Sequence, residues 1–189
     1  MSDALKENIL QDYVNKLCKH SRIASDAVKI YLSDADKPER SKEELSIAKY
    51  AEVLLEFVYF YLHFTDRFAF IQMEEDIRDA LMTELEEGCI NSAIDFGFFG
   101  LPENPKEEIR KASFDSFGFR QAEYSRYKKT FAEKDEGYKD TLFWEFSKNI
   151  EGLVGREHDI GLKMMCIRIS VEAIGDLDPK SFIEMVKGD

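Results

Sequence analysis

The chain has 189 residues, a length that one hydrophobic core can serve, so we expect a single domain spanning residues 1–189. It combines 44% hydrophobic and 34% charged residues with only four Pro and ten Gly, a mixture typical of amphipathic helices. The formal net charge of −12 repels phosphate groups, so we expect neither nucleic acid nor a membrane as a partner.

The first predicted elements are two helices followed by a polar stretch. Apolar residues recur at helical spacing from Asp3 to Lys19, and a shorter helix is predicted from Ala24 to Leu32. A polar segment containing Pro38 follows. Ser41 and Glu44 then match the capping box Ser-x-x-Glu, which predicts that a long central helix starts near Ser41.

The central helix contains no Pro or Gly before Gly88, and helical periodicity continues to about Phe96. The sequence fits equally a continuous helix and one broken near Gln72–Glu75, where a group of carboxylates begins. Further helices are expected at Asn104–Phe131, Asp140–Leu153, Ile160–Ile174 and Asp178–Val186. No stretch shows the alternation of a strand, so we predict a compact all-α bundle of about six to eight helices.

Three cysteines, Cys18, Cys89 and Cys166, are widely spaced and include no Cys-x-x-Cys pair, which argues against a disulfide framework or a zinc site. Their apolar surroundings indicate buried thiols in a reducing compartment. The first eight residues lack the apolar stretch of a signal peptide. The dense apolar run Phe57–Leu62 is far shorter than the roughly 20 residues that span a bilayer. We therefore expect a cytoplasmic protein.

The central helix divides into a broad apolar face and a narrow polar stripe when its residues are placed on a helical wheel. The members of the stripe are Lys49, Glu52, Glu56, His63, Asp66, Arg67 and Glu74. The simplest interpretation is that the stripe is the solvated outer face of the helix.

A second interpretation starts from the aromatic residues Tyr59 and Phe60, which lie within this stripe. The stretch Phe57–Phe64 is apolar on nearly every side apart from His63, and a helix of that kind is usually buried. Burial would require partners for the charged residues, in a structural network or in a ligand site. The candidate ligand-binding residues are Glu56, His63, Asp66 and Arg67. Tyr59 and Phe60 can instead form an interface between subunits.

His63 and Asp66 are the candidate metal ligands, because a spacing of three residues lets both side chains point the same way. The Glu-x-x-His pattern of ferritin-like di-iron sites does not occur, and nothing in the sequence identifies a cofactor. From Arg120 to Lys129, basic and aromatic residues alternate, as they do in some nucleic-acid sites. The acidic net charge favours packed tyrosines with outward basic side chains, or a face that docks an acidic partner.

No phosphate-binding, nucleophile-elbow or zinc-protease motif occurs in the chain. We therefore predict a non-enzymatic interaction protein that acts through association, in the first place as a homo-oligomer. The alternative is a helical bundle that binds a metal or a small ligand, or an enzyme, through Glu56, His63, Asp66 and Arg67. A carrier of apolar ligands in a Phe-rich core is the third hypothesis, so a small-molecule ligand is not excluded.

Overall fold

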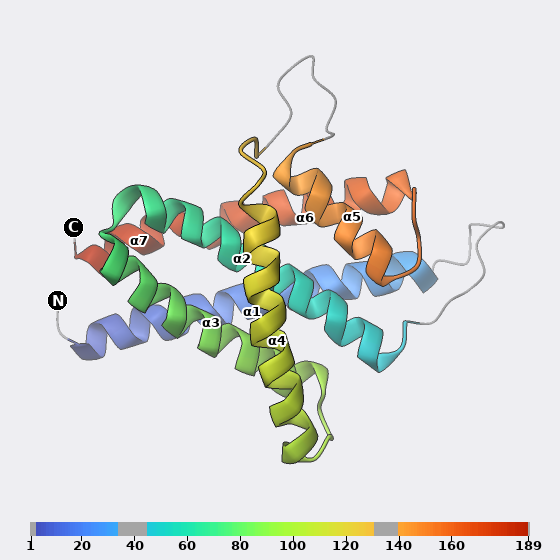
Figure 1. Ribbon diagram of the computed structural model, residues 1–189, viewed down its shortest axis with the longest axis horizontal. Helices are drawn as coiled ribbons and strands as arrows, with labels where there is room; N and C mark the ends of the chain where they lie inside the picture. The colour runs from blue at the N-terminus through green and yellow to red at the C-terminus, as the bar shows by residue number, and fades with distance from the viewer. Residues whose placement is uncertain (1–2, 34–44, 131–139, 189) are drawn as a thin grey trace.

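The computed structural model describes residues 3–33, 45–130 and 140–188, and every regular element within these ranges is a helix. The seven helices are α1 (Asp3–Ser33), α2 (Ile47–Gln72), α3 (Glu75–Gly97), α4 (Glu103–Tyr124), α5 (Leu142–Leu153), α6 (Ile160–Leu177) and α7 (Pro179–Lys187). The all-α prediction is thereby confirmed. Figure 1 shows α2 at the centre with α4 crossing in front of it. None of the described helices is long and apolar enough to cross a membrane.

α1 is one helix where the sequence predicted two. The polar residues around Ser21 are satisfied within the helix, since the hydroxyls of Ser21 and Ser25 donate to the carbonyls of Leu17 (3.0 Å) and Ser21 (2.8 Å), one turn earlier. Both serines are fully buried, as are Ala24 and Val28 beside them. The continuous helix packs against α2, α3, α6 and α7.

α2 begins at Ile47 and not near Ser41. Ser46 is its N-cap, and the Ser46 hydroxyl oxygen accepts a hydrogen bond from the backbone N–H of Lys49 at 3.2 Å. The predicted capping box of Ser41 and Glu44 lies outside the described residues. A serine hydroxyl caps the start of the helix, as predicted, but the serine is Ser46.

The helix breaks at Met73 and Glu74, which decides between the two alternatives that the sequence left open. Met73 (φ −124°, ψ 152°) and Glu74 (φ −65°, ψ 148°) both have extended backbone. α3 then starts with Glu75 and Asp76, whose carboxylates are favourable at the positive end of a helix dipole. After the break, α3 packs alongside α2.

The core is built around α2, which contacts α1, α3, α4, α5 and α7. Phe60 of α2 stacks on Phe146 of α5, with 4.0 Å between ring centroids. Phe60 also meets Phe143 and Tyr124 edge to face, at 5.1 Å and 5.8 Å. Buried apolar side chains from all seven helices form one continuous cluster.

α4 ends at Tyr124, earlier than the predicted end near Phe131. The chain leaves the helix through a turn in which the Tyr127 N–H donates to the Tyr124 carbonyl at 3.1 Å. The Lys129 carbonyl then accepts from the N–H of Leu142 at 2.9 Å, at the start of α5. We call Ser125–Thr130 the post-α4 segment, and Arg67 of α2 donates to it at Tyr127 and Thr130.

Side-chain caps set the starts of the last three helices. Thr141, Asp159 and Asp178 each accept a hydrogen bond from the backbone N–H three residues further along. Asp178 adopts the left-handed conformation between α6 and α7, and Pro179 is the first residue of α7. The prediction that Asp178 and Pro179 begin the last helix is confirmed.

We predict that Phe60→Ala lowers the free energy of unfolding by about 3–5 kcal/mol, because the ring is fully buried at the centre of the core. Urea denaturation followed by circular dichroism measures the loss. Phe99→Ala is the matched control: it removes the same atoms from a side chain that is 90% exposed, and the change should stay below about 0.5 kcal/mol. An equal decrease in the free energy of unfolding in the two variants would contradict the placement of Phe60 at the centre of the core.

Candidate functional site

Every residue of α2 from Val53 to Thr65 is buried, including two charged or titratable members of the predicted polar stripe. Only 3% of Glu56 and 4% of His63 is exposed. The interpretation of the stripe as a solvated face is therefore wrong for these two residues. The helix is enclosed, as its apolar surroundings favoured, and its polar groups need partners inside the protein.

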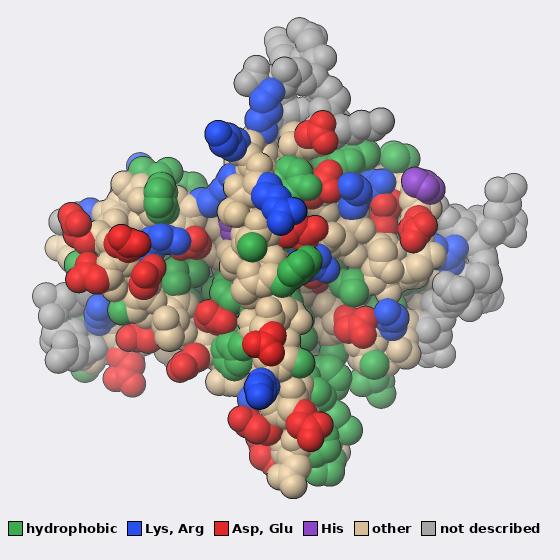
Figure 2. All heavy atoms as spheres, viewed as in Figure 1, with side chains coloured by type: hydrophobic (Ala, Val, Ile, Leu, Met, Phe, Trp, Pro, Cys, Tyr) green, Lys and Arg blue, Asp and Glu red, His purple; other side chains and the backbone are tan. Residues whose placement is uncertain are grey.

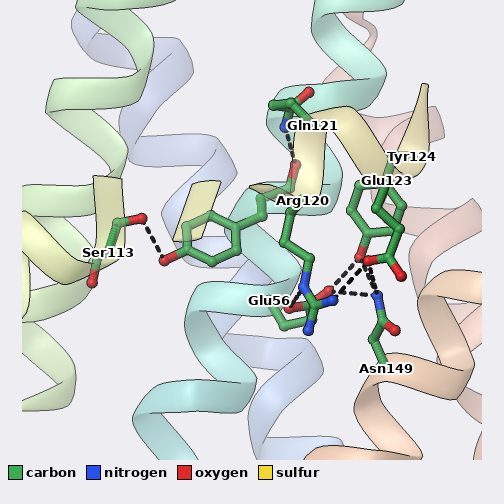
Figure 3. A network of polar contacts seen from close by, with 8 residues as sticks. Glu56, Ser113, Arg120, Gln121, Glu123, Tyr124 and Asn149 are labelled. Atoms are coloured by element: carbon green, nitrogen blue, oxygen red, sulfur yellow. Dashed lines mark hydrogen bonds and ion pairs between the residues drawn. The ribbon is translucent and has the colours of Figure 1, made fainter. Parts of the chain in front are cut away.

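Glu56 is the centre of a hydrogen-bond network that joins three helices (Figure 3). Its Oε2 accepts from Arg120 Nε of α4 at 2.9 Å. Its Oε1 accepts from the Tyr124 hydroxyl and, at 3.2 Å, from Asn149 Nδ2 of α5. Arg120 also pairs through Nη1 with Glu123 at 2.7 Å. Both carboxylate oxygens of Glu56 are thus engaged, and the network ties α2 to α4 and α5.

Burial and pairing act on Glu56 in opposite directions. Desolvation raises the pKa of Glu56, while the Arg120 guanidinium and the Tyr124 hydroxyl oppose that rise. Burial and the neighbouring carboxylate raise the pKa of Tyr124 well above its usual value, so its hydroxyl remains a proton donor. A network in which both carboxylate oxygens already have partners holds the three helices together.

His63 is held in one orientation by Gln121 of α4. The Gln121 amide nitrogen donates to the Tyr59 carbonyl at 3.2 Å, so its amide oxygen faces His63 Nδ1, 2.7 Å away. Nδ1 is therefore the protonated nitrogen of the neutral ring. Burial lowers the pKa of His63 and favours that neutral form. Nε2 is left as an acceptor, buried and without a hydrogen-bond partner among the described residues.

Asp66 and Arg67 follow on α2 and take different partners. Arg78 of α3 donates from Nε and Nη2 to the two oxygens of Asp66, at 2.7 and 2.9 Å. Arg67 donates to neutral oxygens of the post-α4 segment, the Tyr127 carbonyl and, at 3.2 Å, the Thr130 hydroxyl. Among the described residues no carboxylate pairs with Arg67, and burial alone lowers its pKa.

His63, Asp66 and Arg67 line one pocket of about 710 Å³, which we call the His63 pocket. Its other lining residues are Phe64, Phe68, Phe70 and Ile71 of α2, Arg78 of α3, and Ser125, Lys128 and Thr130 of the post-α4 segment. Figure 2 shows basic side chains gathered towards the upper, C-terminal end of α4, whereas its lower end carries mostly acidic ones. Three cationic side chains and one carboxylate line this pocket in a strongly acidic chain.

The structure separates Glu56 from the other three predicted ligand-binding residues. Glu56 lines a different pocket of about 310 Å³, together with Ser113 and Arg120. Since its oxygens are already bonded within the network, the candidate site narrows to His63, Asp66 and Arg67.

The predicted metal ligands are directed to different partners. His63 Nδ1 is bonded to Gln121, and both Asp66 oxygens are bonded to Arg78. Within residues 3–33, 45–130 and 140–188, no group of three or more His, Cys, Asp or Glu side chains is placed to hold a metal ion. The candidate pair therefore does not converge on a common position.

The predicted interface residues Tyr59 and Phe60 lie inside the chain. Tyr59 is 4% exposed and Phe60 is not exposed at all. The Tyr59 hydroxyl donates to the Ser113 carbonyl of α4 at 3.0 Å, and the Phe60 ring is covered by α5. Neither side chain reaches a surface where a second subunit could contact it, so the prediction of an interface at these two residues is wrong.

The residues that complete the network and the pocket come from α3, α4, the post-α4 segment and α5, and most of them were not predicted from the sequence. Arg78 and Asn149 belong to no motif, and they lie 12 and 93 residues from Asp66 and Glu56, their partners on α2. One signal was present, the alternation of basic and aromatic residues after Arg120. That stretch supplies Arg120 and Tyr124 to the network and Lys128 to the pocket.

Comparisons with models of protein families, with curated proteins and with solved structures found no significant match. Function must therefore be argued from the site itself. The His63 pocket is the candidate site, because it combines free hydrogen-bonding capacity with apolar walls.

We predict that Arg120→Leu lowers the free energy of unfolding at pH 7 by about 3–5 kcal/mol, because the buried Glu56 carboxylate loses its cation. The loss is smaller at pH 5. Without Arg120 the pKa of Glu56 in the folded protein rises further above its value in the unfolded chain. Between these two pKa values the folded state holds a proton that the unfolded state has released. Stability then falls as the pH rises towards the raised value. Urea denaturation at the two pH values measures both effects.

Two further variants test the cause. Glu56→Gln added to Arg120→Leu should recover part of the stability at pH 7, because it removes the unpaired charge. Arg110→Leu is the control, since Arg110 pairs with the exposed Asp95, Glu103 and Glu107, and it should change stability little. A loss that is independent of pH, with no recovery in the double variant, would show that Glu56 is not the group responsible.

Proposed function

We propose that the protein binds, in the His63 pocket, a small molecule that carries an anionic group and an apolar body. The observation that supports this is Arg67, a partly buried guanidinium without a carboxylate partner among the described residues. Arginine has five N–H donors, and the hydrogen bonds to Tyr127 and Thr130 use two of them. The remaining donors can bind a carboxylate or a phosphate without breaking those bonds.

Other charges in the pocket favour the same ligand. Lys128 is exposed and forms no ion pair with any described residue, whereas the charge of Arg78 is balanced by Asp66. His63 adds a positive charge when it takes a proton. A local surplus of cations in a chain of net charge −12 selects for anions over cations.

The apolar wall favours a ligand with an alkyl or aryl group. Phe70 is 70% and Ile71 79% exposed, so a ligand that covers them removes apolar surface from water. The volume of about 710 Å³ lies within the range of roughly 300–1,000 Å³ found for small-molecule sites. Carboxylic acids and phosphate monoesters with a chain or ring are the chemical class that combines both requirements.

We predict that octanoate or octyl phosphate binds the protein and raises its melting temperature, while octylammonium does not. Isothermal titration calorimetry and thermal unfolding measure this. Inorganic phosphate tests the head group alone, and octanol tests the apolar body alone. Tighter binding of octyl phosphate than of octanoate would assign the site to phosphate monoesters, and the reverse order to carboxylic acids. Failure of all the anionic ligands to bind would refute the proposal.

Arg67→Gln should weaken binding of the best ligand by about tenfold or more, equivalent to about 1.4 kcal/mol. The matched control is Arg126→Gln, the same change in charge at an exposed residue of the post-α4 segment that does not line the pocket. Binding should also strengthen as the pH falls through the mildly acidic range, because a bound anion raises the lowered pKa of His63 and favours its protonated form. Equal binding by the two arginine variants would overturn the role of Arg67.

Self-association is the second candidate function, on a surface other than the one that the sequence suggested. We call Phe98–Pro102 the α3–α4 tip, and Figure 1 shows this turn projecting from the bundle. Phe99 is 90% exposed, and Leu101 and Phe96 beside it are 43% and 42% exposed. A projecting group of apolar side chains is typical of a contact surface. Two copies that pack their tips together would bury Phe99 in an isologous dimer.

Sedimentation velocity tests this candidate. Phe99→Ser should convert the dimer to a monomer with an unchanged helical circular dichroism spectrum, because the side chain contributes little to the monomer core. Phe70→Ser, at another exposed phenylalanine, should leave the dimer intact. A wild-type chain that sediments as a monomer at every concentration at which it stays dissolved would exclude the dimer.

A further inference from the structure

Cys18 and Cys89 face each other where α1 and α3 pack closely. Gly88 of α3 permits this approach, because a Cβ there would lie 3.1 Å from the Val14 side chain of α1. Cys18 is one turn beyond Val14, and Cys89 follows Gly88. The Cys18 thiol donates to the backbone carbonyl of Cys89, with 3.7 Å between sulfur and oxygen, so the Cys18 side chain lies directly beside Cys89.

The two thiols differ in exposure and in acidity. Cys18 is half-buried, and the neighbouring Cys89 side chain lowers its pKa; burial opposes this shift, while Ser92 and the charge of Arg22 add to it. Cys89 is fully buried, and burial raises its pKa well above the usual value. Cys18 is therefore the more accessible and the more acidic of the two thiols, so an oxidant reaches it first, and Cys89 lies beside it as the second thiol.

We propose that Cys18 and Cys89 form a redox site that a hydroperoxide oxidises to a reversible intramolecular disulfide. The Cys18 thiolate attacks the outer peroxide oxygen, the O–O bond breaks, and the leaving alkoxide or hydroxide takes up a proton. The product is a Cys18 sulfenic acid. The Cys89 sulfur then attacks the Cys18 sulfur, and the hydroxyl group leaves with the Cys89 proton as water. Two thiols are oxidised, and one hydroperoxide is reduced to an alcohol, or to water, plus water.

The packing of α1 against α3 suits this bond. A disulfide requires Cα atoms within about 7 Å, a range that two helices reach where a small residue lets their backbones approach. Gly88 is such a residue. The bond would join positions 71 residues apart, so it would restrict the unfolded chain and raise the melting temperature of the oxidised protein. The third thiol, Cys166, is fully buried in α6, and burial raises its pKa, so it is a control within the same molecule.

The experiment treats the full native chain with one equivalent of hydrogen peroxide, alkylates free thiols with iodoacetamide, and maps peptides without reduction. We expect a Cys18–Cys89 cross-link within one chain, a raised melting temperature, and reversal of both by dithiothreitol. Cys166→Ser should give the same cross-link. Cys89→Ser should leave a Cys18 sulfenic acid that dimedone labels, whereas Cys18→Ser should leave Cys89 unmodified.

Three outcomes would overturn the proposal. The first is oxidation of Cys18 to sulfinic acid without a bond to Cys89, and the second is equal oxidation of Cys166. The third is a cross-link that joins two chains. The wild-type mapping decides these outcomes without any substitution, so it holds even if a cysteine variant fails to fold. None of them depends on a ligand in the His63 pocket.

Discussion

The burial of α2 on every side from Val53 to Thr65 is the constraint on which the rest of the structure depends. The helix brings Glu56, Tyr59, His63 and Thr65 into the core together with its apolar side chains. Neighbouring helices pair with three of these groups: Arg120 and Asn149 bind Glu56, the Ser113 carbonyl binds Tyr59, and Tyr13 binds Thr65 at 2.8 Å. Among the described residues, His63 is paired only at Nδ1, with Gln121. Apolar packing alone tolerates shifts of one helix along another. Hydrogen bonds at this depth do not, so they set the positions of α1, α4 and α5 around α2.

The His63 pocket forms where this enclosure ends. His63 is the last titratable residue of the buried stretch, Asp66 and Arg67 are half-buried, and Phe70 and Ile71 are exposed. α4 ends beside this transition, and its following segment supplies the far wall. Arg67 is thus desolvated enough to favour a counter-charge, yet it contacts only neutral oxygens among the described residues. The same helix thus carries the Glu56 network, in which both carboxylate oxygens are paired, and three turns later the His63 pocket, in which Arg67 has no counter-charge among the described residues.

Sequence reasoning recovered what depends on local periodicity. Most of the helices and the turn at Asp178 follow from the spacing and kind of nearby residues, whereas enclosure of the stretch around His63 was only the second of two interpretations. α1 was divided wrongly, because serine hydroxyls that bond to the backbone look polar in sequence although they are satisfied in the helix. The partners of Glu56 and Asp66 could not be predicted, since tertiary packing alone brings Asn149 or Arg78 to them. The interpretation of Glu56 as solvent-exposed was wrong for that reason, because a carboxylate is stable in the core only where such partners surround it.

α3 is the element that links the two chemical sites. Its docking depends on glycines: a Cβ at Gly88 would meet Val14 of α1, and one at Gly97 would meet the Ala51 Cβ of α2, each at 3.1 Å. Close backbone approach at two places fixes the helix against both neighbours. The same docking carries Arg78 to Asp66 at the His63 pocket and Cys89 to Cys18 at the interface with α1. A side chain that pushed α3 outward would therefore disturb both sites at once, although no residue belongs to both.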